Sequence, residues 1–173
     1  VLSFLEEAVY QMRQVKATPG QVNPVPSADL QLKAGFEKGA RGVGESKILD
    51  IKQQQDCRFH HVALIPELPR ALPSALKAIR EADLILLGPG SLYTSVIPNL
   101  LVEGVPEAIA QSDALKIYVC NIMTQDGETE GYTAGDHLEA LMNHGAPGLV
   151  DLCLANSAPV QAGLVERYRA EDA

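Results

Sequence analysis

The sequence lacks several features that would point to a particular class of protein. Among its 173 residues there is no Trp, and there are only 3 Cys and 3 Phe. Its apolar runs, such as residues 83–87, have the length of a buried strand and fall far short of the roughly 20 residues that a membrane span needs. We therefore expect no membrane-spanning segment.

Basic residues are also in short supply. The chain carries 14 Lys and Arg against 22 Asp and Glu, which gives a formal net charge of −8. Contacts along a nucleic acid need a clustered surplus of cationic side chains. The charge therefore argues against nucleic acid as a partner, and any phosphate ligand has to be held by a local cradle.

Cysteine and histidine do not occur in metal-binding patterns. Cys57, Cys120 and Cys153 are irregularly spaced, and neither a Cys-x-x-Cys pair nor a His-x-x-x-His spacing occurs. The neighbours His60 and His61 would point to opposite faces of a strand rather than share a metal. We predict no metal site, no cofactor and no catalytic set. The odd cysteine count and the absence of a signal peptide favour a reducing cytoplasm.

What the sequence does contain is 46% hydrophobic residues in patterns that predict one α/β domain over residues 1–173. Its first part, 1–70, begins with an amphipathic helix at 1–15 that has no capping residue before it, so the chain reads as though cut from something longer. Period-two alternation and several glycines then predict a small antiparallel β excursion over 22–51, followed by a strand at 61–66.

The second part, 71–173, alternates strands and helices, which is typical of a mainly parallel sheet with helices on its faces. We expect strands at 83–87, 115–120 and 149–154, and helices at 74–82, 95–101, 105–111, 134–143 and 160–170. This order predicts a Rossmann-like, three-layer αβα fold. Ligands bind beyond the carboxyl ends of parallel strands, so the loops after Leu87, Cys120 and Leu154 should converge on one crevice.

The loop after the first of these strands has the strongest binding pattern, with the candidate residues Gly88, Pro89, Gly90, Ser91, Tyr93, Thr94 and Ser95. Its glycines allow a tight turn and close approach to a ligand. Its hydroxyls lie beside the free amides of a helix N-terminus, where phosphate binds favourably. The loop is neither a Walker loop nor a dinucleotide fingerprint. The same residues also fit an ordinary strand-to-helix turn with Ser and Thr caps.

The loop after the second strand, 121–133, is long and polar, and such loops inside a compact domain are usually functional or disordered. Asn121, Thr124 and Gln125 are candidates for hydrogen bonds to a sugar or a base, and Tyr132 is a candidate for stacking on one.

Other polar residues have a structural alternative. Thr133 suits the cap of the following helix, with Asp136 in its first turn and His137 as a structural residue. Near the end of the chain, a ligand contact and a simple turn both fit Asn156, and Arg167 is solvated unless the crevice reaches it. The long loop also carries three acidic residues, Asp126, Glu128 and Glu130. We expect them on a solvated face of the loop, and the alternative is that they help to bind a metal.

These loops closely resemble the CofD-like/YvcK family, the gluconeogenesis factor proteins. The resemblance rests on GPGSLYTS at 88–95 and NIMTQ at 121–125, and it extends over 32–37, 44–46, 82–102, 118–125, 131–133, 136–137 and 167–168. It implies a CofD-like fold. Family members begin with a GGGTG-like loop and an acidic-glycine segment, and neither occurs here, so the resemblance implies the C-terminal portion of such a protein. The truncated sheet would then expose apolar surface and favour a homo-oligomer.

The resemblance also implies a function. The loop forms are similar to the YvcK branch, which implies a cytoplasmic regulatory protein that binds UDP-N-acetylglucosamine and influences carbon metabolism, cell-wall synthesis and cell shape. Loop 88–95 would line the site, with Asn121, Thr124 and Gln125 nearby, while Tyr132 and Arg167 would match the family's sugar-nucleotide contacts. Two alternatives stay open: a CofD-like transfer of a phospholactyl group from a guanylyl donor to a deazaflavin precursor, and a remnant that only folds or dimerises.

Overall fold

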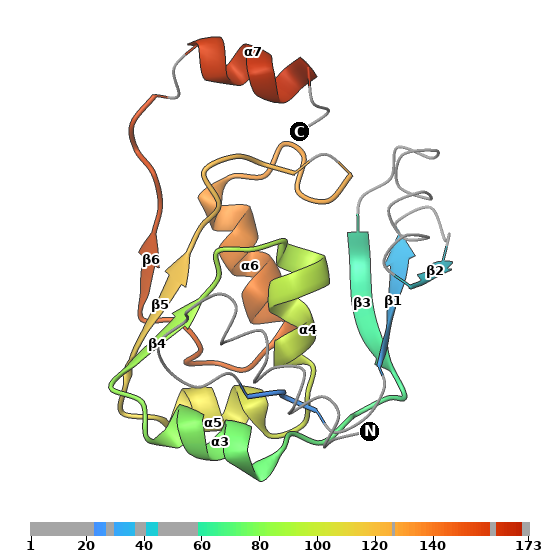
Figure 1. Ribbon diagram of the computed structural model, residues 1–173, viewed down its shortest axis with the longest axis vertical. Helices are drawn as coiled ribbons and strands as arrows, with labels where there is room; N and C mark the ends of the chain where they lie inside the picture. Colours follow the sequence, from blue (N-terminus) through green and yellow to red (C-terminus); the bar gives the residue numbers. More distant parts are fainter. Residues whose placement is uncertain are drawn as a thin grey trace, which may run out of the picture.

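The computed structural model describes residues 23–26, 30–36, 41–44, 59–125, 127–159 and 162–170. The helix predicted at 1–15 lies outside these residues. Figure 1 shows two small sheets with helices between and below them, and a last helix at the upper end.

The antiparallel sheet predicted for the first part of the chain is confirmed. Its strands are β1 (Gln31–Phe36), β2 (Arg41–Val43) and β3 (Phe59–Ile65), in the order β2-β1-β3. Period-two alternation turns Ala34 and Phe36 of β1 toward the interior, where both are buried.

The parallel sheet is confirmed as well, and with it the mixed α/β class. Its strands are β4 (Leu84–Leu87), β5 (Leu115–Val119) and β6 (Leu152–Leu154), all parallel, in the order β4-β5-β6. Strand β6 is shorter than predicted. Residues 149–151 precede it and are not part of the strand. The Asp151 amide donates to the Lys116 carbonyl over 2.8 Å, but the Lys116 amide donates to the Asp151 carboxylate over 2.9 Å.

The helices are α3 (Pro73–Arg80), α4 (Ile97–Leu100), α5 (Val105–Gln111), α6 (Ala134–His144) and α7 (Ala162–Ala170). The helix predicted from Ser95 begins earlier, as a π-helical turn η1 (Leu92–Val96), because the Val96 amide reaches the Ser91 carbonyl. Thr133 caps α6 in a reciprocal pair with Asp136, as predicted. Among the described helices, none has the length and apolarity needed to cross a membrane.

Helices α4 and α6 lie between the two sheets (Figure 1). One buried cluster joins the layers: it includes Leu87 and Tyr118 of the parallel sheet, Ile97 of α4, Leu141 of α6 and Val62 of β3. Burial of this apolar surface is the main favourable term in folding. Among the described residues, this packing covers one face of the parallel sheet.

Candidate functional site

The loops predicted to carry the ligand leave the same edge of the parallel sheet. Strands β4, β5 and β6 pair in parallel, so their carboxyl ends meet at one edge, the upper one in Figure 1. Helix α7 lies at this end of the molecule too. The position is the one at which α/β sheets usually bind ligands.

The loops after β4 and β5 are joined by the side chain of Asn121. The Gly90 amide donates to Asn121 Oδ1 over 3.2 Å, and Asn121 Nδ2 donates to the Gly90 carbonyl over 3.0 Å. Gly88 is needed for the turn before this contact: its φ is +83°, and a Cβ there would lie 2.9 Å from the Val119 carbonyl oxygen. The sequence therefore brings these predicted residues together through specific backbone contacts.

A second link joins Ser91 to Gln125. Ser91 Oγ donates to Gln125 Oε1 over 2.7 Å. The Gln125 amide donates in turn to Thr129 Oγ1 over 2.9 Å, and Thr129 is completely buried. Gln125 is thus held on both its side chain and its backbone, which fixes the start of the long loop.

The third link joins two tyrosines. The hydroxyls of Tyr93 and Tyr132 lie 2.9 Å apart, and their rings meet edge to face. Burial raises the pKa of the Tyr93 phenol far above its usual value, so it is neutral. Tyr132 is half-buried and also meets the ring of His137 edge to face at 5.4 Å. His137 itself is buried and contacts the Thr133 carbonyl, which agrees with the structural role expected for it.

Glu128 overturns two expectations. It was predicted on a solvated loop face, but it is only 3% exposed, and its Oε1 accepts a hydrogen bond from the Thr94 amide over 3.0 Å. The amide of Thr94 is therefore not free for a phosphate. Burial raises the pKa of the Glu128 carboxyl group, and hydrogen bonds from Thr94 and the amides of Leu92 and Tyr93 oppose that effect. Glu130 is exposed, as predicted.

Local sequence patterns gave no signal for this role of Glu128. The Glu128 carboxyl group lies at the start of η1, although Glu128 follows Thr94 by 34 residues in the chain. Helix caps are recognised from residues next to the helix. A cap supplied by a distant loop can only be found once the sheet has brought the two loops together.

Some predicted residues stand apart from this network. Ser95 and Thr124 are exposed, and Arg167 is exposed on α7. Asn156 closes a local turn with Ala158, by hydrogen bonds of 3.0 and 3.1 Å, which fits the structural alternative. Asp126 lies outside the described residues. The ligand roles of these residues, like those of all the other candidate residues, stay predictions.

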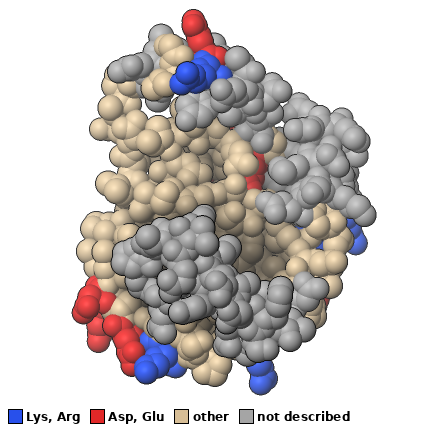
Figure 2. Space-filling view, in the orientation of Figure 1, with Lys and Arg blue, Asp and Glu red and all other residues tan. Residues whose placement is uncertain are grey.

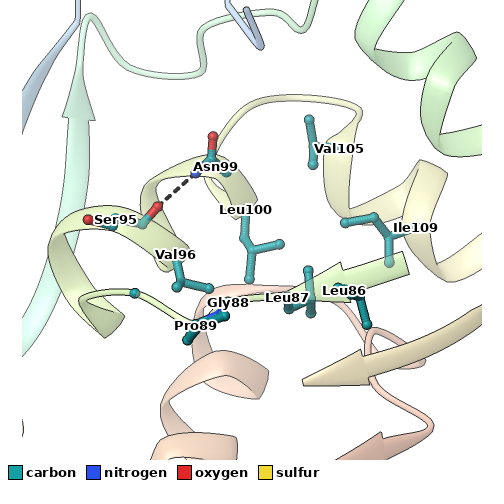
Figure 3. A pocket seen from close by; sticks show the side chains of 11 residues that line it. Leu86, Leu87, Gly88, Pro89, Ser95, Val96, Asn99, Leu100, Val105 and Ile109 are labelled. Atoms are coloured by element: carbon teal, nitrogen blue, oxygen red, sulfur yellow. Dashed lines mark hydrogen bonds between the residues drawn. The ribbon is translucent and has the colours of Figure 1, made fainter. Parts of the chain in front are cut away.

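A pocket of about 320 Å³ adjoins the loop after β4. Its lining includes four of the predicted residues, Gly88, Pro89, Gly90 and Ser95. Figure 3 shows the apolar side chains of α4, α5 and β4 around the rest of it. A mostly apolar cavity with a few polar groups at its mouth is typical of small-molecule sites.

Among the described residues, no group of three or more His, Cys, Asp or Glu side chains is arranged to hold a metal ion. Cys120 is buried at the end of β5, whereas Cys153 is exposed on β6, and both are free thiols. His61 stacks on His144 of α6 at 5.8 Å, and burial lowers the pKa of His144.

Fold and site together define an α/β protein with a candidate ligand site at the carboxyl edge of its parallel sheet. The family model described as 2-phospho-L-lactate transferase CofD matches residues 2–173. The chain belongs to the CofD family.

Relatives within the family are gluconeogenesis factors. The chain is 44% identical over 165 residues to the gluconeogenesis factor of Halalkalibacterium halodurans, covering 95% of this chain and 50% of the relative. With the gluconeogenesis factor of Bacillus subtilis it shares 43% identity, over 96% of this chain and 51% of the relative. A crystal structure of a UPF0052 family protein from Bacillus halodurans matches with a TM-score of 0.86 at 43% identity, over 96% of this chain and 53% of that chain. The chain thus spans about half the length of these relatives.

Proposed function

We propose that this chain contributes the ligand-binding loops of a cytoplasmic regulatory protein of the gluconeogenesis-factor type, which binds a UDP-sugar such as UDP-N-acetylglucosamine. Through that ligand, the protein would influence carbon metabolism, cell-wall synthesis and cell shape. The names of its relatives support the regulatory part of this proposal. The loop network supports the binding part.

Gly90 is the observation that carries the proposal. Its φ lies outside the left-handed region, and a Cβ there would make only ordinary contacts, 3.7 Å from Ser95 Cβ and 3.8 Å from a methyl group of Val96. The described fold therefore does not require glycine at this position. A ligand that comes close to the backbone does require it, and Gly90 lines the pocket.

The other site residues suit the parts of a nucleotide sugar. Tyr132 is half-buried and its ring suits stacking or edge contact with a base or sugar, and Thr124 and Ser95 are exposed residues that carry hydroxyls. Arg167 suits the diphosphate because guanidinium groups bind phosphate through charged, paired hydrogen bonds. The Thr94 amide does not take part, since Glu128 occupies it.

A second candidate function is phospholactyl transfer. The description of the matching family model as a 2-phospho-L-lactate transferase favours it. This reaction would consume a guanylyl donor, and phosphoryl chemistry of this kind usually needs a divalent cation to neutralise charge.

Thermal unfolding with added ligands tests the proposal. The midpoint should rise with millimolar UDP-N-acetylglucosamine and not with GDP and magnesium, because a ligand that binds only the folded chain stabilises it by mass action. Gly90→Ala should keep the unliganded midpoint and lose the shift, and Tyr132→Ala should weaken it. A shift with GDP and magnesium alone would favour the transferase, and a full shift in Gly90→Ala would contradict the role given to Gly90.

A further inference from the structure

Tyr132, the candidate for stacking on a ligand, is held by two other rings. Its hydroxyl lies 2.9 Å from the Tyr93 hydroxyl, and the Tyr93 ring meets it edge to face at a centroid distance of 6.4 Å and an angle of 78°. The ring of His137 meets it at 5.4 Å and 87°. Edge-to-face arrangements are a preferred geometry of aromatic pairs. The contacts therefore hold Tyr132 both at its hydroxyl and at its ring.

Of the two tyrosines, Tyr93 is the one that its surroundings fix. It is only 4% exposed. Its ring also meets that of His144 in α6 edge to face at 5.8 Å, and His144 stacks on His61 of β3. Burial keeps the pKa of the Tyr93 phenol far above its usual value, so the hydroxyl retains its proton. Tyr93 therefore offers a hydroxyl at a position that is set by the packing of η1 against α6.

Tyr132 is the tyrosine that depends on this support. It is half-buried and follows the exposed Gly131, whose φ is +72° and around whose Cβ position nothing lies within 4 Å. A side chain on so open a turn samples several rotamers unless contacts select one. Figure 2 shows few charged side chains on the described surface between α7 and the lower end of the molecule. Rings and hydroxyls are therefore the groups that this surface offers to a ligand.

We propose that Tyr93 is a positioning residue: its hydroxyl selects the orientation of the Tyr132 ring, and of the two only Tyr132 touches the ligand. The inference rests on the proposed function, in which Tyr132 contacts a base or sugar. A binding side chain that is already held in its bound orientation loses less conformational freedom when the ligand arrives, so support by its neighbours raises affinity. Loss of the Tyr93 hydroxyl should therefore weaken binding although no ligand contact is removed.

A double-mutant cycle in this chain tests the coupling. The variants are Tyr93→Phe, Tyr132→Phe and the double variant, and their affinity for UDP-N-acetylglucosamine is obtained from the rise in the thermal midpoint over a series of ligand concentrations. Tyr93→Phe should weaken binding about three- to tenfold, the usual net contribution of one hydrogen bond. In the Tyr132→Phe background the same substitution should have no further effect, because the hydroxyl pair is already broken.

Tyr118→Phe is the matched control, since it removes the hydroxyl of another buried tyrosine, in β5, and should leave the affinity unchanged. Parent affinity in Tyr93→Phe would overturn the proposal. So would an equal loss in both backgrounds of the cycle, because Tyr93 would then act without the Tyr132 hydroxyl. The same loss in Tyr118→Phe would overturn it too, since a general structural effect would explain both variants.

Fluorine NMR distinguishes a failure of this inference from a failure of the proposed function. With meta-fluorotyrosine in place of all 5 Tyr, the Tyr132 signal is assigned by its absence in Tyr132→Phe. Without any ligand, Tyr93→Phe should move that signal and increase its accessibility to a soluble paramagnetic probe, and Tyr118→Phe should not. An unchanged Tyr132 signal in Tyr93→Phe would overturn the positioning role. A moved signal together with no midpoint shift in the parent chain would support the orienting role of Tyr93 and contradict the proposed function.

Discussion

The two faces of the parallel sheet carry similar side chains and have opposite surroundings. Leu87 is buried against the helices between the sheets, whereas its neighbour Leu86 is 55% exposed on the opposite face. The strand and the residue type are the same, so neither explains the difference. What decides burial is whether another layer packs on that face, and among the described residues no layer covers the face that carries Leu86.

Truncating Leu86 and Leu87 one at a time is the most direct test of this comparison. Leu87→Ala should cost roughly 2–4 kcal/mol of unfolding free energy, because it removes buried contacts and leaves a cavity. Leu86→Ala should change it by about 0.5 kcal/mol or less. Urea unfolding of both variants measures the difference, and equal losses would mean that Leu86 is packed in solution.

Gly88 and Gly90, in the loop after β4, allow a similar comparison of two variants. Gly88→Ala should destabilise the fold by about 1–3 kcal/mol, since alanine is strained at positive φ and its Cβ would press on the Val119 carbonyl. Gly90→Ala should leave the unfolding free energy within about 0.5 kcal/mol of the parent chain. Differential scanning calorimetry distinguishes the two, and a destabilised Gly90→Ala would mean that the fold itself needs that glycine.

A substitution at Asn121 tests how much the hydrogen bonds between the loops after β4 and β5 stabilise the fold. Asn121→Asp keeps the acceptor for the Gly90 amide and loses the donor to the Gly90 carbonyl, so a loss of about 1–2 kcal/mol is expected. Thr124→Val is the control, because Thr124 is exposed on the same loop. Chemical denaturation of both proteins gives the comparison, and the account fails here if the two variants are equally stable.

Glu128 gives the smallest effect, in the pH dependence of stability. Its pKa is raised in the folded state, so the folded chain binds its proton more readily than the unfolded chain. The resulting stability is present below the unfolded pKa of about 4.3 and is lost as the pH rises through the folded value, with a slope of at most about 1.4 kcal/mol per pH unit.

Glu128→Gln should remove that slope while keeping an oxygen for the Thr94 amide. Unfolding measured at a series of pH values from acid to neutral reveals it. Glu130→Gln, on the exposed side of the same turn, is the control. An unchanged slope in Glu128→Gln would show that the Glu128 carboxyl titrates normally.

The sequence was sufficient to predict the order of most of the described strands and helices because their periodicity and breakers are local, although the bounds of β6 and of the helix after β4 differ from those predicted. The range of α5 was predicted without error, and Thr133 was recognised as a cap from its neighbours. The π-helical turn and the burial of Glu128 were not predictable, since both depend on contacts between segments that meet only in the folded sheet. The pairing of Asn121 with Gly90 is of the same kind: the residues were predicted, but not their contact.

The central claim is that ligand binding belongs to the loops at the carboxyl edge of the parallel sheet, on its packed side. Hydrogen–deuterium exchange of this chain with and without UDP-N-acetylglucosamine tests it most directly. The account predicts slower exchange in 88–96 and 121–133 and no change in α3 or in the antiparallel sheet. Protection confined to other segments, or none at saturating ligand, would contradict it.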